Sequence, residues 1–158
     1  MAYEIDYIPV GEGDKGGDCI AMRFWDPLIG LSSQKVVVID GGYKDTAELL
    51  INLIRNVYGA EKIDLVIATH PDMDHVSGLL PVLEEIKVEN LIIHKPWEHV
   101  QDIKRSFLNG KLTVSGIKND LEESLGSASD LEDMALKKGV IINEPFAGMT
   151  GFDGKMHV

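Results

Sequence analysis

The sequence predicts an α/β fold in which parallel strands alternate with helices. Three short apolar segments, at residues 36–39, 63–68 and 90–94, have the length and the Val, Leu and Ile content of strands buried on both faces. Segments with helical periodicity separate them. Because strand, helix, strand, helix, strand is a βαβαβ unit, we expect one sheet with right-handed crossovers and with the carboxyl ends of its strands at a shared edge.

Two further strands are expected at the N-terminus, at residues 3–10 and 18–25. The glycine-rich turn between them, residues 11–17, matches the pattern G-x-G-x-x-G. A dinucleotide-binding loop requires a helix to begin at the third glycine, but a strand follows here, so a hairpin turn is favoured. Cys19 is the single cysteine and is expected to be a buried thiol, which excludes a disulfide within the chain.

The first helix is expected to begin at Asp45, with Glu48 completing a capping box, and to end at Gly59. Its buried face would consist of Ala47, Leu50, Leu53, Ile54 and Val57. A second helix is expected from Ser77 to about Lys87. These helices supply the two crossovers of the βαβαβ unit.

After Pro96 the pattern becomes polar and helical. Residues 98–108 and 121–138 predict surface helices that cover the sheet, and residues 139–142 and 155–158 predict short strands. The length of 158 residues suits one domain, so we treat residues 1–158 as a single unit.

The net charge of −11 argues against generic binding to nucleic-acid backbones, which are themselves anionic. No stretch approaches the roughly 20 apolar residues that cross a bilayer, so no membrane partner is expected. The first residues lack the basic and apolar regions of a signal peptide. With one cysteine, these features predict a cytoplasmic protein.

Side chains able to bind a metal ion follow each of the three predicted parallel strands. Asp40, His70 and His94 are therefore expected at the same edge of the sheet. His94 and His99 are candidate ligands or substrate contacts, although an ordinary loop histidine is the more common case. Trp97 lies beside them and is expected to pack.

Four ligand-type side chains are crowded into the segment 69–75: His70, Asp72, Asp74 and His75. Pro71 fixes its own φ and keeps His70 out of a helix, so His70 and Asp72 can point to one side. Asp74 and His75 follow as the chain turns and can reach a second cation. Two metal ions about 3.5–4 Å apart can activate a water between them. The alternative is an acidic loop with incidental histidines, but the density of ligand types favours a metal site.

The segment Thr69-His70-Pro71-Asp72-Met73-Asp74-His75 resembles the H-x-H-x-D-H signature of the metallo-β-lactamase superfamily, with Asp72 in the place of the second histidine. Residues 38–42 resemble the superfamily's first motif. Residues 10–14, followed by a strand, resemble the N-terminal signature of the subgroup that includes the hydrolase domain of DNA-uptake competence proteins, which also tolerates H-x-D-x-D-H. The resemblance covers about residues 3–95.

This resemblance implies a metallo-β-lactamase-like αβ/βα sandwich, with its first half clearly present and its second half truncated or missing. Residues 1–158 would then form a single, incomplete domain. The resemblance also implies that His70 and Asp72 bind one metal ion and that Asp74 and His75 bind the other. Asp74 would in addition orient the attacking water, and Asp40 would hold the loop by hydrogen bonds.

The implied cofactors are one or two divalent metal ions, Zn, Mn or Fe, with the carboxylate of Asp72 shifting the preference towards Mn or Fe. The implied function is a metal-dependent hydrolase acting on an ester or phosphodiester bond of a small-molecule or phosphoester substrate. One alternative is a di-iron redox protein of the same superfamily. Another is a truncated, non-catalytic domain that binds metal or a partner, and an exposed sheet face would then favour a homo-oligomer.

Overall fold

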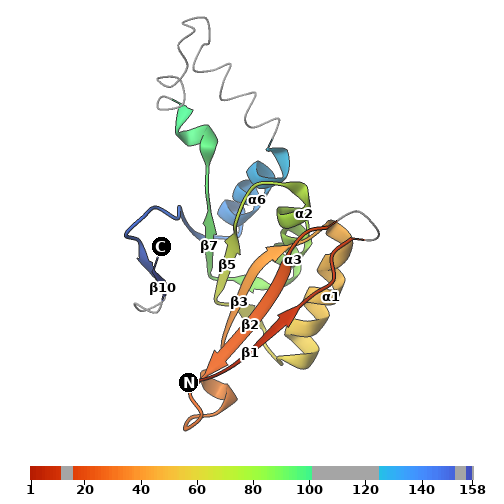
Figure 1. Cartoon of the computed structure of the whole chain (residues 1–158), viewed down its shortest axis with the longest axis vertical. Helices are drawn as coiled ribbons and strands as arrows, with labels where there is room; N and C mark the ends of the chain where they lie inside the picture. The colour runs from red at the N-terminus through yellow and green to blue at the C-terminus, as the bar shows by residue number, and fades with distance from the viewer. Residues whose placement is uncertain (12–15, 101–124, 152–155, 158) are drawn as a thin grey trace, which may run out of the picture.

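The computed structural model describes residues 1–11, 16–100, 125–151 and 156–157. In these residues the main sheet has six strands, in the order β1-β2-β3-β5-β7-β8 (Figure 1). Their bounds are β1 (Ala2–Tyr7), β2 (Cys19–Trp25), β3 (Lys35–Gly41), β5 (Leu65–Ala68), β7 (Asn90–Ile93) and β8 (Ile141–Asn143). Strands β1, β2 and β3 are antiparallel, whereas β3, β5, β7 and β8 run parallel. The predicted hairpin and the predicted parallel sheet are both confirmed.

Two short ladders accompany the main sheet. Strand β4 (Lys62–Ile63) pairs in parallel with β6 (Lys87–Val88), and β9 (Thr150–Gly151) pairs antiparallel with β10 (Met156–His157). The single strand predicted for residues 63–68 is divided at Asp64. The buried carboxylate of Asp64 accepts hydrogen bonds from the Val36 N–H and the Lys35 Nζ, both at 2.9 Å.

The helical segments are η1 (Leu31–Ser33), η2 (Lys44–Thr46), α1 (Ala47–Asn52), the π-helical η3 (Leu53–Val57), α2 (Met73–Val76), α3 (Leu79–Glu85), η4 (Pro96–Glu98) and α6 (Gly126–Lys137). Helices α1, α3 and α6 lie together on one side of the sheet (Figure 1). Buried side chains of these helices and of η3 form one core with the sheet residues of that face: Leu50, Ile54, Leu79, Leu83 and Leu131 against Val38, Val66 and Leu91. None of the described helices is long and apolar enough to span a membrane.

The first helix differs from its prediction at its start and in its last turn. It opens with the 3-10 turn η2, and no side chain caps η2 or α1, so the predicted capping box of Asp45 and Glu48 is wrong. The π-helical turn η3 then rotates the buried face, because it holds more residues per turn than an α-helix. As a result Val57 is 55 % exposed, whereas Tyr58 is 2 % exposed. Gly59, with a φ of 62°, ends the segment as predicted.

The second helix begins earlier than predicted. Helix α2 starts at Met73, inside the segment 69–75 (called the ligand-rich segment below), and α3 follows it. Gly78 lies at their junction and packs directly on the end of β3. A Cβ built on Gly78 would lie 2.0 Å from the Gly41 carbonyl oxygen. The absence of a side chain here lets the junction approach the sheet closely enough to fix the position of α2.

The C-terminal predictions are tested in part. Residues 101–108 and 121–124 of the two predicted surface helices lie outside the described residues. Helix α6 accounts for most of the helix predicted for residues 121–138. Its buried residues Ala128, Leu131 and Ala135 pack in the core between the helices and the sheet. Strand β8 overlaps the strand predicted for residues 139–142, and β10 lies within the strand predicted for residues 155–158.

The face of the sheet that turns away from the helices is also apolar. Val37, Leu65 and Ile92 are buried on it, and Ile39 and Ile67 pack against them. Strands apolar on both faces are typical of a sheet that forms an inner layer of a domain.

Candidate metal centre

The site is built at the carboxyl edge of the parallel strands. Ile39 in β3 and Ile67 in β5 are register partners, so Asp40 and Thr69 come to the same edge from neighbouring strands. The Thr69 N–H donates to one oxygen of Asp40 at 2.8 Å, and the Thr69 hydroxyl donates to the other. The strand end therefore fixes the first residue of the ligand-rich segment.

Asp40 holds the far end of this segment as well. Its Oδ2 lies 3.0 Å from the Nδ1 of His75, and its carboxyl is buried, with a residue exposure of 1 %. Asp40 has a φ of 56°, a left-handed conformation that Asp adopts more readily than most residues. The loop-holding role that the resemblance implies for Asp40 agrees with these three contacts.

The two histidine rings of the segment lie against each other. The ring centroids of His70 and His75 are 3.6 Å apart, with an interplanar angle of 51°. Each ring has its Nδ1 engaged: His70 by the Thr69 hydroxyl at 2.9 Å, and His75 by the Asp40 carboxylate. Because an ionised carboxylate only accepts, a hydrogen bond between His75 and Asp40 requires the proton on the His75 Nδ1.

The two remaining carboxylates pair with these rings. Asp72 Oδ2 lies 3.7 Å from the Nε2 of His70, and Asp74 Oδ2 lies 3.6 Å from the Nε2 of His75. These distances exceed a hydrogen bond. They are close to the separation of two ligand atoms on one tetrahedral cation, about 3.4 Å when each lies about 2.1 Å from the ion. The local fold supports this arrangement, because α2 begins after Asp72 with no side-chain cap and leaves that carboxylate free.

The donor set fits a divalent cation. Asp40, His70 and His75 each offer a ligand atom, and these atoms all lie within 4.8 Å of one another. Within the described part of the chain this is the one group of three or more ligand-type residues so gathered. Imidazole nitrogen and carboxylate oxygen are ligands for Zn, Mn and Fe. His75 and Asp40 are buried, so part of the site is shielded from water.

Of the predicted ligands His70, Asp72, Asp74 and His75, the group of ligand atoms within 4.8 Å of one another includes only His70 and His75, and Asp72 and Asp74 each lie beside one of these rings. Asp40 is the third member of this group, so its carboxylate lies near both rings as well as holding the segment by hydrogen bonds. The division of ligands between one or two ions remains a prediction.

His94 and His99 are engaged elsewhere, by Glu144. Glu144 Oε2 lies 2.8 Å from the His99 Nε2, and Glu144 Oε1 lies 3.6 Å from the His94 Nδ1 and accepts the Lys95 N–H at 2.8 Å. Both imidazole rings form T-shaped contacts with the Phe146 ring, each with centroids 5.5 Å apart. Burial alone would raise the pKa of Glu144, but the Lys95 N–H and His99 outweigh it and lower that pKa.

Sequence reasoning missed Glu144, and no local pattern marks it. It follows β8 as a single acidic residue, and only the parallel pairing of β7 with β8 brings it to the residues after His94. Trp97 is buried as predicted, and its indole N–H donates to Glu132 in α6 at 2.8 Å. The residues that follow β7 are thereby hydrogen-bonded both to Glu144, after β8, and to Glu132 in α6.

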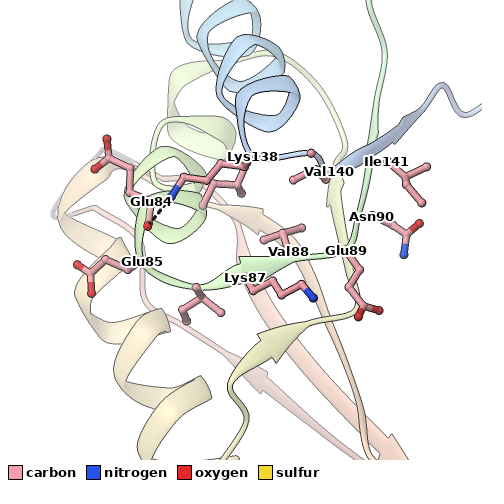
Figure 2. A pocket seen from close by; sticks show the side chains of 12 residues that line it. Glu84, Glu85, Lys87, Val88, Glu89, Asn90, Lys138, Val140 and Ile141 are labelled. Carbon is pink, nitrogen blue, oxygen red and sulfur yellow. Dashed lines mark hydrogen bonds between the residues drawn. The ribbon is translucent and has the colours of Figure 1, made fainter.

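A cavity of about 510 Å³ adjoins the ligand-rich segment. Its wall includes Asp72 and Asp74 on one side and the start of α6, at Gly126 and Ser127, on the other. The pocket in Figure 2 is a different one. It is lined by β6 and by the first residues of β7 and β8, where the Lys138 Nζ donates to the Glu84 carbonyl oxygen. Those are the amino ends of the parallel strands, so this pocket lies at the opposite end of the sheet from the candidate metal centre.

The chain resembles solved structures. A Thermotoga maritima protein assigned as a metallo-beta-lactamase superposes with a TM-score of 0.50 at 12 % identity, covering 97 % of this chain. The chain spans 63 % of the length of that protein. A metallo-beta-lactamase from Hirschia baltica is also similar, at 16 % identity and a TM-score of 0.34, covering 68 % of this chain and 50 % of its own. No curated protein matches the chain in sequence.

The family comparison is more direct. The model of the metallo-beta-lactamase superfamily matches residues 28–140, more than half of the chain. The match includes Asp40, the whole segment 69–75 and the parallel strands that carry them. With the mixed α/β sheet and the histidine–aspartate cluster at its carboxyl edge, this match shows that the chain belongs to the metallo-beta-lactamase superfamily.

Proposed function

We propose that the chain is a metal-dependent hydrolase whose divalent ions are held by His70, Asp72, Asp74 and His75. One observation carries the proposal: each histidine has its Nδ1 engaged by a neighbour and its Nε2 facing a carboxylate at 3.6–3.7 Å. Metal-binding imidazoles usually have one ring nitrogen held by a neighbouring group, which leaves the other ring nitrogen for the ion.

The protein groups have distinct tasks in this proposal. A bound divalent ion lowers the pKa of water and polarises the bond to be cleaved. Asp74, partly exposed beside the cavity of about 510 Å³, orients the attacking water and accepts its proton. Asp40 and Thr69 keep the segment in place without touching the substrate.

The metal and the substrate class are finer parts of the proposal. Asp72 offers a hard oxygen ligand where histidine is more usual, which favours Mn or Fe, with Zn also accommodated. The substrate is an ester or a phosphodiester. Phosphodiester cleavage is supported by the resemblance of residues 10–14 to the subgroup of competence proteins, which is an argument by analogy.

The test compares metal-stripped protein with protein reloaded with Zn, Mn or Fe, using bis(4-nitrophenyl) phosphate and 4-nitrophenyl acetate as substrates. Hydrolysis that requires metal is expected. Asp74→Asn should lower kcat by about 100-fold or more, because proton transfer by a positioned side chain contributes at least that much. Asp133→Asn, which removes the same charge from the exposed face of α6, is the matched control and should leave kcat unchanged.

Other outcomes separate the alternatives. Equal turnover by metal-free protein would contradict the proposal. Oxygen consumption and visible absorbance by iron-loaded protein, without hydrolysis, would favour a di-iron redox protein. Tight metal binding with no turnover of either kind would favour a non-catalytic domain.

A further inference from the structure

Strand β2 begins directly against the metal centre. A Cβ built on Gly17 would lie 2.3 Å from the Asp74 carbonyl oxygen, so the backbone of Gly17 packs on Asp74. The next residue, Asp18, accepts the Gly42 N–H at 2.9 Å through its carbonyl oxygen. These two contacts fix the start of β2 between α2 and the end of β3.

This placement brings a further carboxylate to His75. Asp18 Oδ2 lies 3.8 Å from the His75 Nδ1, the same nitrogen that lies 3.0 Å from Asp40 Oδ2. The two carboxylates differ in their surroundings, since the Asp40 side chain is 2 % exposed and the Asp18 side chain is 65 % exposed. The imidazole is therefore flanked by one buried and one solvent-facing negative charge.

The buried carboxylate is shared. Asp40 Oδ2 also accepts a hydrogen bond from the Thr69 hydroxyl, so His75 is one of two groups that contact this oxygen. A second negative charge near Nδ1 favours the tautomer with its proton on that atom. It also increases the electron density at Nε2, the atom that faces Asp74.

We propose that Asp18 is a positioning residue of the metal centre, which strengthens cation binding by holding His75 with its Nδ1 protonated and its Nε2 free. This inference rests on the proposed metal-dependent function. Asp18 acts through His75, and its own carboxylate does not bind the ion. The glycine before it is required because any side chain there would displace Asp74.

The test measures Mn²⁺ and Zn²⁺ binding by calorimetry in Asp18→Asn. The dissociation constant should rise roughly tenfold, the lower end of the range for such outer partners, because Asp18 is solvent-exposed. Glu61→Gln is the matched control. Glu61 is an exposed carboxylate before β4, at the other end of β5, and its loss should change the constant by less than about twofold. Asp18→Glu should restore most of the affinity.

A second measurement needs no metal. The imidazole ¹⁵N shifts of metal-free protein should place the His75 proton on Nδ1 in the wild type and show a larger Nε2-protonated population in Asp18→Asn. If Asp18→Asn matches Glu61→Gln in affinity and leaves the shifts unchanged, the inference is wrong. If the wild type binds neither cation, the proposed function fails instead, and a shift change in Asp18→Asn would still show that Asp18 holds His75.

Discussion

Asp40 and Thr69 are joined by two hydrogen bonds across the ends of adjacent parallel strands, one from the Thr69 N–H at 2.8 Å and one from its hydroxyl. Both bonds reach a carboxylate that is almost completely buried. The ligand-rich segment therefore begins at a position set by the sheet. A preorganised segment of this kind lowers the entropy that binding must overcome.

Replacing Asp40 by Ala should lower the free energy of unfolding by about 3 kcal/mol, because it removes the acceptor of two Thr69 donors and of the buried His75 imidazole. Urea unfolding at pH 7 measures this change. Asp45→Ala is the control, since Asp45 is exposed and makes no capping hydrogen bond, and it should stay within about 0.5 kcal/mol. If Asp40→Ala changed the free energy of unfolding as little as Asp45→Ala, the segment would not be held through the Asp40 carboxylate.

Gly78→Ala should be strongly destabilising, by roughly 2–4 kcal/mol, although alanine normally favours helices. A Cβ there would lie 2.0 Å from the Gly41 carbonyl oxygen, so the helical junction would have to move off the sheet. The same change at Gly126, where a Cβ meets nothing within 4 Å, should be neutral or mildly stabilising. Thermal unfolding of the two variants gives the comparison, and similar melting temperatures would refute the close approach.

Asp64 should make the fold more stable at neutral pH than in acid. Burial raises its pKa, but hydrogen bonds from Lys35, the Val36 N–H and Lys62 outweigh burial and lower it below the unfolded value of about 3.9. A lowered folded pKa contributes stability above the unfolded pKa, and that contribution is lost as pH falls through the folded pKa. Asp64→Asn should therefore cost about 2 kcal/mol at pH 7 and much less near pH 2, as measured by urea unfolding. A cost that does not change with pH would contradict this assignment.

Asp72→His tests the metal preference. It substitutes the more usual imidazole for a carboxylate that is 66 % exposed and can be exchanged without repacking the core. The ratio of Mn²⁺ to Zn²⁺ affinity should fall by about tenfold, because imidazole suits zinc better than manganese. Competition calorimetry of both proteins measures the ratio. An unchanged ratio would mean that Asp72 does not contact the ion.

The sheet and the position of the site could be predicted because they depend on local patterns. Apolar segments of strand length identify β3, β5 and β7, and the parallel topology then places Asp40 and His70 at one edge. The crowding of His70 and His75 with aspartates was visible without any structure. These features follow from strand periodicity and from ligand chemistry at short range.

What the sequence could not predict depends on contacts between distant segments. Val57 looked buried by helical periodicity, but the π-helical turn rotated it outwards. Glu144 lies beside His99 only because β8 pairs with β7, across residues far apart in the chain. Asp18 likewise reaches His75 only through the packing of Gly17 on Asp74.

The most direct test of the account is the metal content and affinity of the wild type compared with His75→Gln, measured by elemental analysis after dialysis and by calorimetry. The wild type should retain one or two divalent ions per chain, and His75→Gln should bind at least about 100-fold more weakly while remaining folded by circular dichroism. A wild type that retains no ion, or a His75→Gln variant with unchanged affinity, would contradict the assignment of the segment 69–75 as the metal centre.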